Sequence, residues 1–369
     1  MASVTNANMD SSDSSSLVSA REVGSSRSWF SWCPTSEKLL ELAEARILKH
    51  LKTRYEKKYV HTEQGHNIWT LRLNPTAANR VPMVMVHGFG GGVGLWVLSL
   101  DHLSKDRSVY AFDLLGFGRS SRPQFSTDAE AAEKEFVDSI ESWRKEQGLE
   151  KFILLGHSLG GFLSCSYAIQ HPERVKHLIL VDPWGFPEKP AEDDLKRQIP
   201  GWIKVLGAVL SPFNPLASLR AAGPWGPSLV QRFRPDFQRK YSSLINDDDT
   251  IVNYIYHCNA QTPSGETAFK HLSIPYGWAK FPMINRIGKL DKRIPITFVH
   301  GARSWVENES ASSVKLLRQD NYVDVQIIKG AGHHVYADRY EDFNKVVDKV
   351  FELVDTAQEV DPVLLESSV

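Results

Sequence analysis

Chemistry in this chain is indicated most clearly by a serine that lies between glycines. Residues 152–161 read Phe-Ile-Leu-Leu-Gly-His-Ser-Leu-Gly-Gly, which places Ser158 in a G-x-S-x-G pattern. The pattern follows a predicted buried strand and precedes a predicted helix, and a sharp turn of this kind lifts a serine hydroxyl clear of the sheet. Gly156 and Gly160 fit because the turn is crowded. We therefore predict that Ser158 is a nucleophile.

A nucleophilic serine needs N–H donors for the negative charge that develops on the attacked carbonyl oxygen. The amide of Leu159, directly after the serine, is one expected donor. The second is expected from Phe89, in the run His-Gly-Phe-Gly-Gly-Gly of residues 87–92. Glycine-rich loops also bind phosphates, but no Gly-Lys-Ser/Thr follows and the spacing differs from that of dinucleotide sites. The run therefore predicts an oxyanion hole.

A serine hydroxyl is a poor nucleophile without a general base. Of the 13 histidines, the expected base comes last in the chain, in a loop after the final strand. Residues 330–338 follow the predicted strand 323–328, and His333 comes directly after three small residues. We predict His333 as the base, with His334 as the alternative.

The acid that orients the base is harder to assign. It usually lies three residues past the glycine that ends a neighbouring strand, but here Gly301 is followed at that distance by Ser304. Glu307 is the next carboxylate and is predicted to reach His333 from a longer loop. Asp182, at the end of an earlier strand, is the alternative.

Composition excludes several other functions. Lys and Arg number 43 against 44 Asp and Glu, a net charge of -1, so no charge excess indicates nucleic-acid binding. Three distant cysteines cannot form a disulfide framework or a four-cysteine zinc site, and we expect neither a metal nor a bound cofactor. No apolar run approaches the roughly 20 residues that span a bilayer, and no signal peptide is evident. These features predict a cytoplasmic protein without a transmembrane segment.

Short apolar runs alternate with amphipathic stretches, which predicts an α/β fold with a doubly wound, mostly parallel sheet. Asp113 and the glycines after it are predicted to fix a turn rather than to do chemistry. The expected strands are residues 67–73, 82–86, 108–112, 152–155, 177–181, 294–299 and 323–328, and the expected helices are residues 129–147, 161–169, 312–317 and 340–354.

The alternation suggests a division of the chain. Residues 1–28 are rich in Ser, Asn and Asp and are predicted to be a disordered tail. Residues 29–54 combine an aromatic segment with a predicted amphipathic helix over 36–52, for which Ser36 is the expected N-cap. The core is predicted over 55–184 and 291–369, and the Pro- and Trp-rich stretch 185–290 is predicted to be an inserted helical cap. The aromatics Trp29, Phe30 and Trp32 either pack on the core or contact a lipid–water interface.

From about residue 66 to 355 the chain resembles the α/β-hydrolase superfamily. Long runs resemble one narrow branch of it, which includes a lipid-droplet coactivator of a triglyceride lipase and an N-acyl phospholipid lipase. The runs that carry this resemblance are residues 112–123, 183–187, 231–237, 254–259 and 333–338.

The resemblance implies two functions. The first is a lipid-droplet protein that coactivates a triglyceride lipase, with the droplet surface and its coat proteins as partners. It is expected to acylate lysophosphatidate with acyl-CoA as co-substrate. The second is a serine hydrolase acting on N-acyl phosphatidylethanolamine or lysophospholipids. The coactivator typically carries Asn at the nucleophile position, whereas this chain has Ser158.

The resemblance also assigns residues. It implies droplet anchoring by Trp29, Phe30 and Trp32, and lipase activation by Arg303 and Gly332. The spacing of His333 and Asp338 resembles an acyltransferase motif, although a base already committed to Ser158 makes that match accidental.

Arg239 and Lys240 precede Ser242 in a pattern that basophilic kinases recognise. Ser242 is therefore a predicted phosphosite, and the matching serine of the coactivator is also one.

Overall fold

The computed structural model describes residues 32–77, 79–190, 216–275 and 277–365, with side chains described to residue 357. The chain divides into two units, residues 1–32 and 33–369, and the fold below is that of the second. The predicted tail, Trp29 and Phe30 lie outside the described residues, as do residues 191–215 of the predicted cap.

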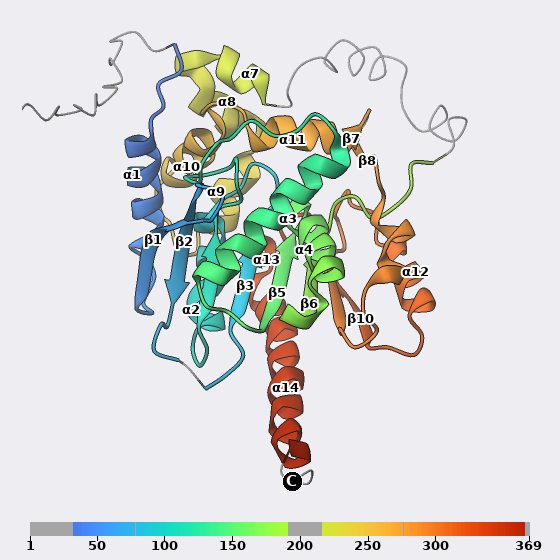
Figure 1. Ribbon diagram of the computed structural model, residues 1–369. Coiled ribbons are helices and arrows are strands. Elements are labelled where there is room, and N and C mark those ends of the chain that lie inside the picture. Colours follow the sequence, from blue (N-terminus) through green and yellow to red (C-terminus); the bar gives the residue numbers. More distant parts are fainter. Residues whose placement is uncertain (1–31, 78, 191–215, 276, 366–369) are drawn as a thin grey trace, which may run out of the picture. The chain divides into compact units, whose positions relative to one another are not determined.

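A mostly parallel eight-stranded sheet forms the centre of the described part of this unit (Figure 1). Its strand order is β1-β2-β4-β3-β5-β6-β9-β10; β2 pairs antiparallel with β1 and β4, and all other neighbours are parallel. This confirms the doubly wound α/β fold. The strands are β1 (Tyr55–His61), β2 (Asn67–Leu73), β3 (Met83–Val86), β4 (Val109–Phe112), β5 (Phe152–His157), β6 (Val175–Val181), β9 (Ile296–Gly301) and β10 (Val323–Ile328).

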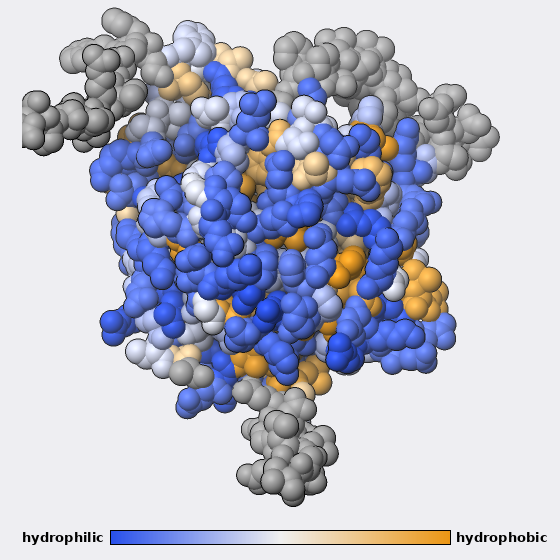
Figure 2. All heavy atoms as spheres, in the orientation of Figure 1, coloured by the Kyte–Doolittle hydropathy of each residue, from blue (hydrophilic) through white to orange (hydrophobic). Residues whose placement is uncertain are grey.

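Helices cover both faces of the sheet, which explains why its central strands are apolar throughout. Successive strand residues enter opposite cores: Val84 and Val86 pack on one side, Met83 and Met85 on the other. One core includes α3 (Ala129–Glu146), α4 (Leu159–Gln170) and α12 (Glu309–Leu317). The other includes α1 (Glu37–Leu48), α2 (Val97–Leu103), α13 (Val335–Asp338) and α14 (Tyr340–Leu365). Over α3 and α4, the face seen in Figure 2 is mainly hydrophilic.

The stretch from residue 216 to 279 forms short helices beyond the carboxyl ends of the strands (Figure 1). Helix α10 packs against α1, and the Thr35 hydroxyl lies 3.0 Å from His257 Nδ1. That these residues act as a separate cap stays a prediction. The elements are α7 (Ala217–Ala221), α8 (Gly226–Phe233), α9 (Pro235–Tyr241), α10 (Thr250–Asn259), α11 (Gly265–Leu272), β7 (Ser273–Ile274) and β8 (Trp278–Ala279).

Helix α1 begins where the sequence predicted. The Ser36 hydroxyl accepts a hydrogen bond from the Leu39 amide at 3.2 Å, which satisfies one of the free donors of the first turn. Glu44, on the same helix, is buried. Its carboxylate lies 3.0 Å from Arg119 Nη1 and accepts from the Trp69 indole at 3.0 Å, and the Arg119 guanidinium stacks 3.6 Å from the Trp69 ring centroid. Burial, then the charge of Asp113, raises the pKa of Glu44 to about 8. The helix is thus tied to the turn after β4 by a buried carboxyl–guanidinium contact.

We expect Glu44→Ala to lower the free energy of unfolding by about 3–5 kcal/mol, because it leaves the largely buried Arg119 guanidinium and the Trp69 indole without their acceptor. Urea unfolding followed by circular dichroism measures this. Glu41→Ala is the matched control, since Glu41 forms an exposed pair with Lys38 on the same helix and its loss is expected to leave stability close to wild type. Equal losses in the two variants would contradict the stabilising role of the buried pair.

Candidate active site

Ser158 lies on the sharp turn between β5 and α4. Its backbone has φ 53° and ψ -120°, a conformation that is strained for a residue with a Cβ. The Ser158 amide donates to the Val181 carbonyl at 3.0 Å, which fixes the turn to the next strand. A Cβ on Gly156 would collide with the Gly160 carbonyl, and one on Gly160 with the Val86 carbonyl. The two glycines are therefore needed for the close approach that presents the serine.

His333 follows β10 and is paired with an acid. Its Nδ1 donates to Asp182 Oδ2 at 2.8 Å, so the imidazole keeps Nε2 as its basic nitrogen. His334 has no such partner in the described structure; its half-buried ring packs against Phe237, with centroids 4.8 Å apart. Burial, then the charges of His157 and His333, hold the pKa of His334 well below its usual value. The geometry therefore favours His333 over His334 as the base.

Asp182, directly after β6, is held by several donors. Its Oδ1 accepts from His300 Nδ1 at 3.2 Å and from the Gly301 amide at 3.3 Å, and its Oδ2 also accepts from the Ser304 hydroxyl. Burial by itself raises the pKa of this carboxyl, but the hydrogen bonds from His300, His333 and Ser304 lower it to about 2. Asp182 is therefore ionised at neutral pH and aims a negative charge at His333.

The preference for Glu307 as the acid is corrected by this geometry. The Glu307 carboxylate accepts from the Ser310 amide and hydroxyl, each at 3.1 Å, at the start of α12. The usual acid position after β9 is held by Ser304, whose hydroxyl points back to Asp182. The carboxylate that holds His333 is instead that of Asp182, directly after β6, which was the alternative predicted from the sequence.

Two amides stand where an oxyanion hole is expected. Leu159 is the first residue of α4, and the first N–H groups of a helix have no acceptor within it. Phe89 lies in the loop after β3 and, like Ser158, lines the pocket. The loop approaches the nucleophile closely, because a Cβ on Gly88 would lie 2.9 Å from Ser158 Cβ. That the amides of Leu159 and Phe89 form an oxyanion hole stays a prediction.

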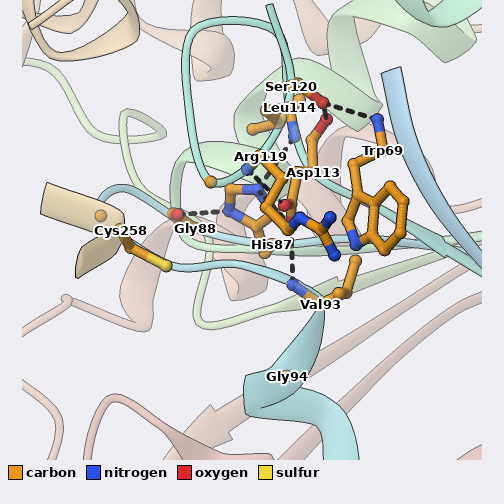
Figure 3. A network of polar contacts seen from close by, with 12 residues as sticks. Trp69, His87, Gly88, Val93, Gly94, Asp113, Leu114, Arg119, Ser120 and Cys258 are labelled. Atoms are coloured by element: carbon orange, nitrogen blue, oxygen red, sulfur yellow. Dashed lines mark hydrogen bonds and ion pairs between the residues drawn. The ribbon is translucent and has the colours of Figure 1, made fainter. Parts of the chain in front are cut away.

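A buried network holds this loop (Figure 3). Asp113 Oδ1 accepts from the Val93 amide and its Oδ2 from the Arg119 amide, both at 2.8 Å. His87 Nε2 accepts from the Leu114 amide at 2.9 Å while its Nδ1 lies 2.8 Å from the Gly88 carbonyl, which fixes the neutral Nδ1–H tautomer. Burial holds the pKa of His87 below its usual value. Asp113 thus holds the loop after β3 to the turn after β4.

A pocket of about 1020 Å³ opens over Ser158 and His333. Its walls are mainly apolar and come from the core and from α7 to α11, with Leu219, Leu229 and Phe269 among them. Phe233 and Trp305 also line it, and both are largely exposed, at 72% and 71%. A pocket of this size and lining suits a largely apolar ligand.

A model of the alpha/beta hydrolase fold family matches residues 81–340. This chain belongs to the α/β-hydrolase fold family. Among its relatives, 1-acylglycerol-3-phosphate O-acyltransferase ABHD5 of Sus scrofa is 58% identical over 321 residues, 87% of this chain and 92% of the relative. (Lyso)-N-acylphosphatidylethanolamine lipase of Bos taurus is 56% identical over 321 residues, 87% of this chain and 94% of the relative. The resemblance to this branch is thereby confirmed.

Solved structures agree on the fold of this α/β hydrolase. A membrane phospholipase A, a bacterial virulence factor, superposes with a TM-score of 0.60 at 22% identity, covering 86% of this chain and 92% of that one. Naproxen esterase of Bacillus subtilis superposes with a TM-score of 0.59 at 17% identity, covering 85% of this chain and 97% of that one. No helix among the described residues of the hydrolase is long and apolar enough to cross a membrane. Those residues also contain no cluster of His, Cys, Asp and Glu that could hold a metal ion.

The structure separates the acyltransferase-like pair of the hydrolase. Asp338 Oδ2 accepts from the Gly332 amide at 2.9 Å, and its Oδ1 lies 3.5 Å from Lys240 Nζ on α9. The ring of His333 is held by Asp182 instead. Asp338 thus supports the backbone of the base's loop.

Arg303 and Gly332 are neighbours in the loops after β9 and β10. The Arg303 amide donates to the Ala331 carbonyl at 2.9 Å, and its guanidinium donates to the Gly330 carbonyl. Arg303 is exposed, so the two residues form part of the surface beside the pocket. Ser242, the predicted phosphosite, is also exposed; it caps the end of α9, where its hydroxyl donates to the Arg239 carbonyl at 2.8 Å.

Three histidine and serine side chains near the site were not singled out from the sequence: His157, His300 and Ser304. Each lies at or just after the carboxyl end of a strand, which is the edge where parallel sheets place their functional groups. That position was the available signal. Which partner each side chain meets depends on neighbouring strands far away in the chain.

Proposed function

We propose that this α/β hydrolase transfers the acyl groups of phospholipids or lysophospholipids through a covalent intermediate on Ser158. The observation that carries the proposal is the 2.8 Å hydrogen bond from His333 to the ionised Asp182, at the base of an apolar pocket that Ser158 also lines. Two relatives named for acyl transfer to 1-acylglycerol-3-phosphate and for cleavage of N-acylphosphatidylethanolamine support the substrate class.

In the proposed reaction, Ser158 Oγ attacks the acyl carbonyl carbon while His333 Nε2 takes its proton. The oxyanion receives hydrogen bonds from the amides of Leu159 and Phe89. The tetrahedral intermediate then expels the leaving group, which is an alkoxide or amine from a phospholipid and the CoA thiolate from acyl-CoA, and which takes the proton from His333. The acyl-enzyme is opened by water, or by a lysophosphatidate hydroxyl when acyl-CoA is the donor, with His333 again moving the proton.

The test is product analysis with purified protein and a panel of lysophosphatidylcholine, lysophosphatidylethanolamine and N-acyl phosphatidylethanolamine, and of lysophosphatidate with acyl-CoA. We expect free fatty acid or an acylated product from at least one of these. If the protein turns over none of these substrates under conditions in which a lysophospholipase control is active, the proposal is contradicted.

A second role, coactivation of a triglyceride lipase at a droplet surface, draws support from exposed aromatic side chains. Trp225 and Phe233 lie at the two ends of α8, 65% and 72% exposed, and Leu229 falls between them at a spacing of four. Aromatic rings of this kind favour a lipid–water interface. The exposed loops of Arg303 and Gly332 would be available to a lipase bound at the same surface.

We expect the double variant Trp29→Ala, Trp32→Ala to bind triolein droplets coated with phosphatidylcholine at least about tenfold more weakly, because each buried ring contributes roughly 1.5–3 kcal/mol. Droplet flotation measures the bound fraction. Phe233→Ala is the comparison variant, since it tests whether the rim of the pocket contacts the droplet. Unchanged flotation of the double variant together with loss in Phe233→Ala would reject the N-terminal anchor and assign contact to α8.

A further inference from the structure

His157 precedes the nucleophile and lies in a closely packed aromatic environment. It is the last residue of β5 and only 2% exposed. Its ring contacts those of Tyr336, with centroids 5.0 Å apart at 83°, and Trp96, at 6.3 Å and 87°. On the third side is His333, whose ring centroid is 4.7 Å away. The imidazole therefore lies between the turn that carries Ser158 and the loop that carries the base.

One hydrogen bond crosses between these two segments. His157 Nε2 lies 3.0 Å from the backbone carbonyl oxygen of His333. A carbonyl oxygen can only accept, so Nε2 carries the proton. Burial, and next the charge of His333, hold the pKa of His157 well below its usual value, so the ring stays neutral. The neutral ring then offers its single N–H to this carbonyl.

The other ring nitrogen has no partner. His157 Nδ1 is buried and makes no hydrogen bond among the described residues. It faces the oxyanion loop, because a Cβ on Gly88 would lie 2.8 Å from it. An unpaired buried nitrogen costs free energy, and an apolar side chain would fill the same space without that cost. What the imidazole supplies and an apolar side chain cannot is the N–H to His333.

The loop of His333 is rich in glycine. It runs Gly-Ala-Gly-His-His over residues 330–334, and two glycines in five residues give the backbone wide freedom. Asp182 holds the His333 ring and Asp338 holds the Gly332 amide. Arg303 holds the carbonyls of Gly330 and Ala331. The hydrogen bond from His157 adds a contact on the carbonyl of the base itself. It joins that carbonyl to the residue adjacent to the nucleophile.

From this geometry we infer that His157 is a positioning residue, which sets the place of the His333 imidazole relative to Ser158 through its N–H···O bond to the His333 backbone. The inference rests on the proposed function. In this role His157 acts through the backbone of the base. Its contribution is orientation, and a displacement of the base by an ångström can cost on the order of a hundredfold in rate.

The test compares variants that keep or remove the N–H at the same place. The amide nitrogen of Gln reaches about as far as Nε2 of His, that of Asn only as far as Nδ1, and Met fills similar space with no donor. Hydrolysis of the soluble ester p-nitrophenyl butyrate gives kcat and KM without a lipid interface. We expect His157→Met and His157→Asn to lower kcat about tenfold or more, with KM within about twofold, and His157→Gln to retain about a third or more of the wild-type kcat.

His177→Met is the matched control. His177 is a buried histidine of the neighbouring strand β6, with Nε2 2.9 Å from the Thr297 hydroxyl, and it lies toward the opposite end of the strand from Asp182. It should lose thermal stability but keep kcat. Equal kcat in the Gln, Asn and Met variants of His157 would overturn the inference while leaving the proposed function intact. If the His157→Met protein does not fold, His157→Gln and His157→Asn give the same comparison. A wild-type protein that hydrolyses no ester would overturn both the proposed function and the inference.

Discussion

Ser158→Ala is expected to lower kcat for ester or lysophospholipid hydrolysis by on the order of 10⁴- to 10⁶-fold, because it removes the atom that forms the acyl-enzyme. The strained backbone at Ser158 supports this assignment, since such strain gathers at functional sites. Fatty-acid release under saturating substrate measures the loss.

Ser164→Ala is the control for that experiment. Ser164 lies on the same helix and is fully buried, but it is not among the residues that line the pocket. We expect it to keep near-wild-type turnover, and both variants to melt close to the wild-type temperature. A Ser158→Ala protein that keeps more than a tenth of the wild-type rate would reject the nucleophile.

Asp182→Asn is expected to lower kcat about 10⁴-fold. The amide that replaces the carboxylate can donate to His333 Nδ1, which favours the tautomer with a proton on Nε2 and no lone pair toward Ser158. It also removes the negative charge that stabilises the imidazolium. Steady-state kinetics with the same soluble ester measure the effect, and KM is expected to change little.

Glu307→Gln gives the matched comparison. Its carboxylate accepts from Ser310, and Gln retains one acceptor oxygen, so turnover should stay within about twofold of wild type. If Glu307→Gln were slow and Asp182→Asn active, Glu307 would be the acid that orients His333, as first expected from the sequence.

Asp182 also links stability to pH. Its pKa is lowered from the usual 3.8 to about 2, so the folded state holds the ionised form more strongly than the unfolded chain does. The stability that it contributes is present in full above about pH 4 and is lost as the pH falls through about 2. Over the neutral range the charge opposite His333 does not change.

The sheet could be predicted because its central strands are buried on both faces. Apolar runs such as 152–155 and 177–181 therefore stand out in the sequence, and the structure extends them by only a few residues. β1 was missed, because four consecutive residues of this strand, 56–59, are exposed and charged or polar for the most part. Its place is set by pairing with β2, a partner that composition does not reveal.

The site could be predicted in part. Ser158 and His333 are marked by local turn chemistry, which the sequence carries within a few residues. The acid is marked by no local pattern: its identity depends on which strand lies beside β9, and the order of β6 and β9 in the sheet brings Asp182 to His333. The partner of His157 is likewise 176 residues away along the chain.

Covalent labelling shows whether Ser158 is an activated nucleophile. Purified protein is treated with a fluorophosphonate probe, and the modified peptide is identified by mass spectrometry. We expect labelling at Ser158 in the wild type, none there in Ser158→Ala, and strongly slowed labelling in His333→Ala. Absence of labelling in the wild type, while a known serine hydrolase in the same tube is labelled, or modification at a residue other than Ser158, would contradict the assignment of Ser158.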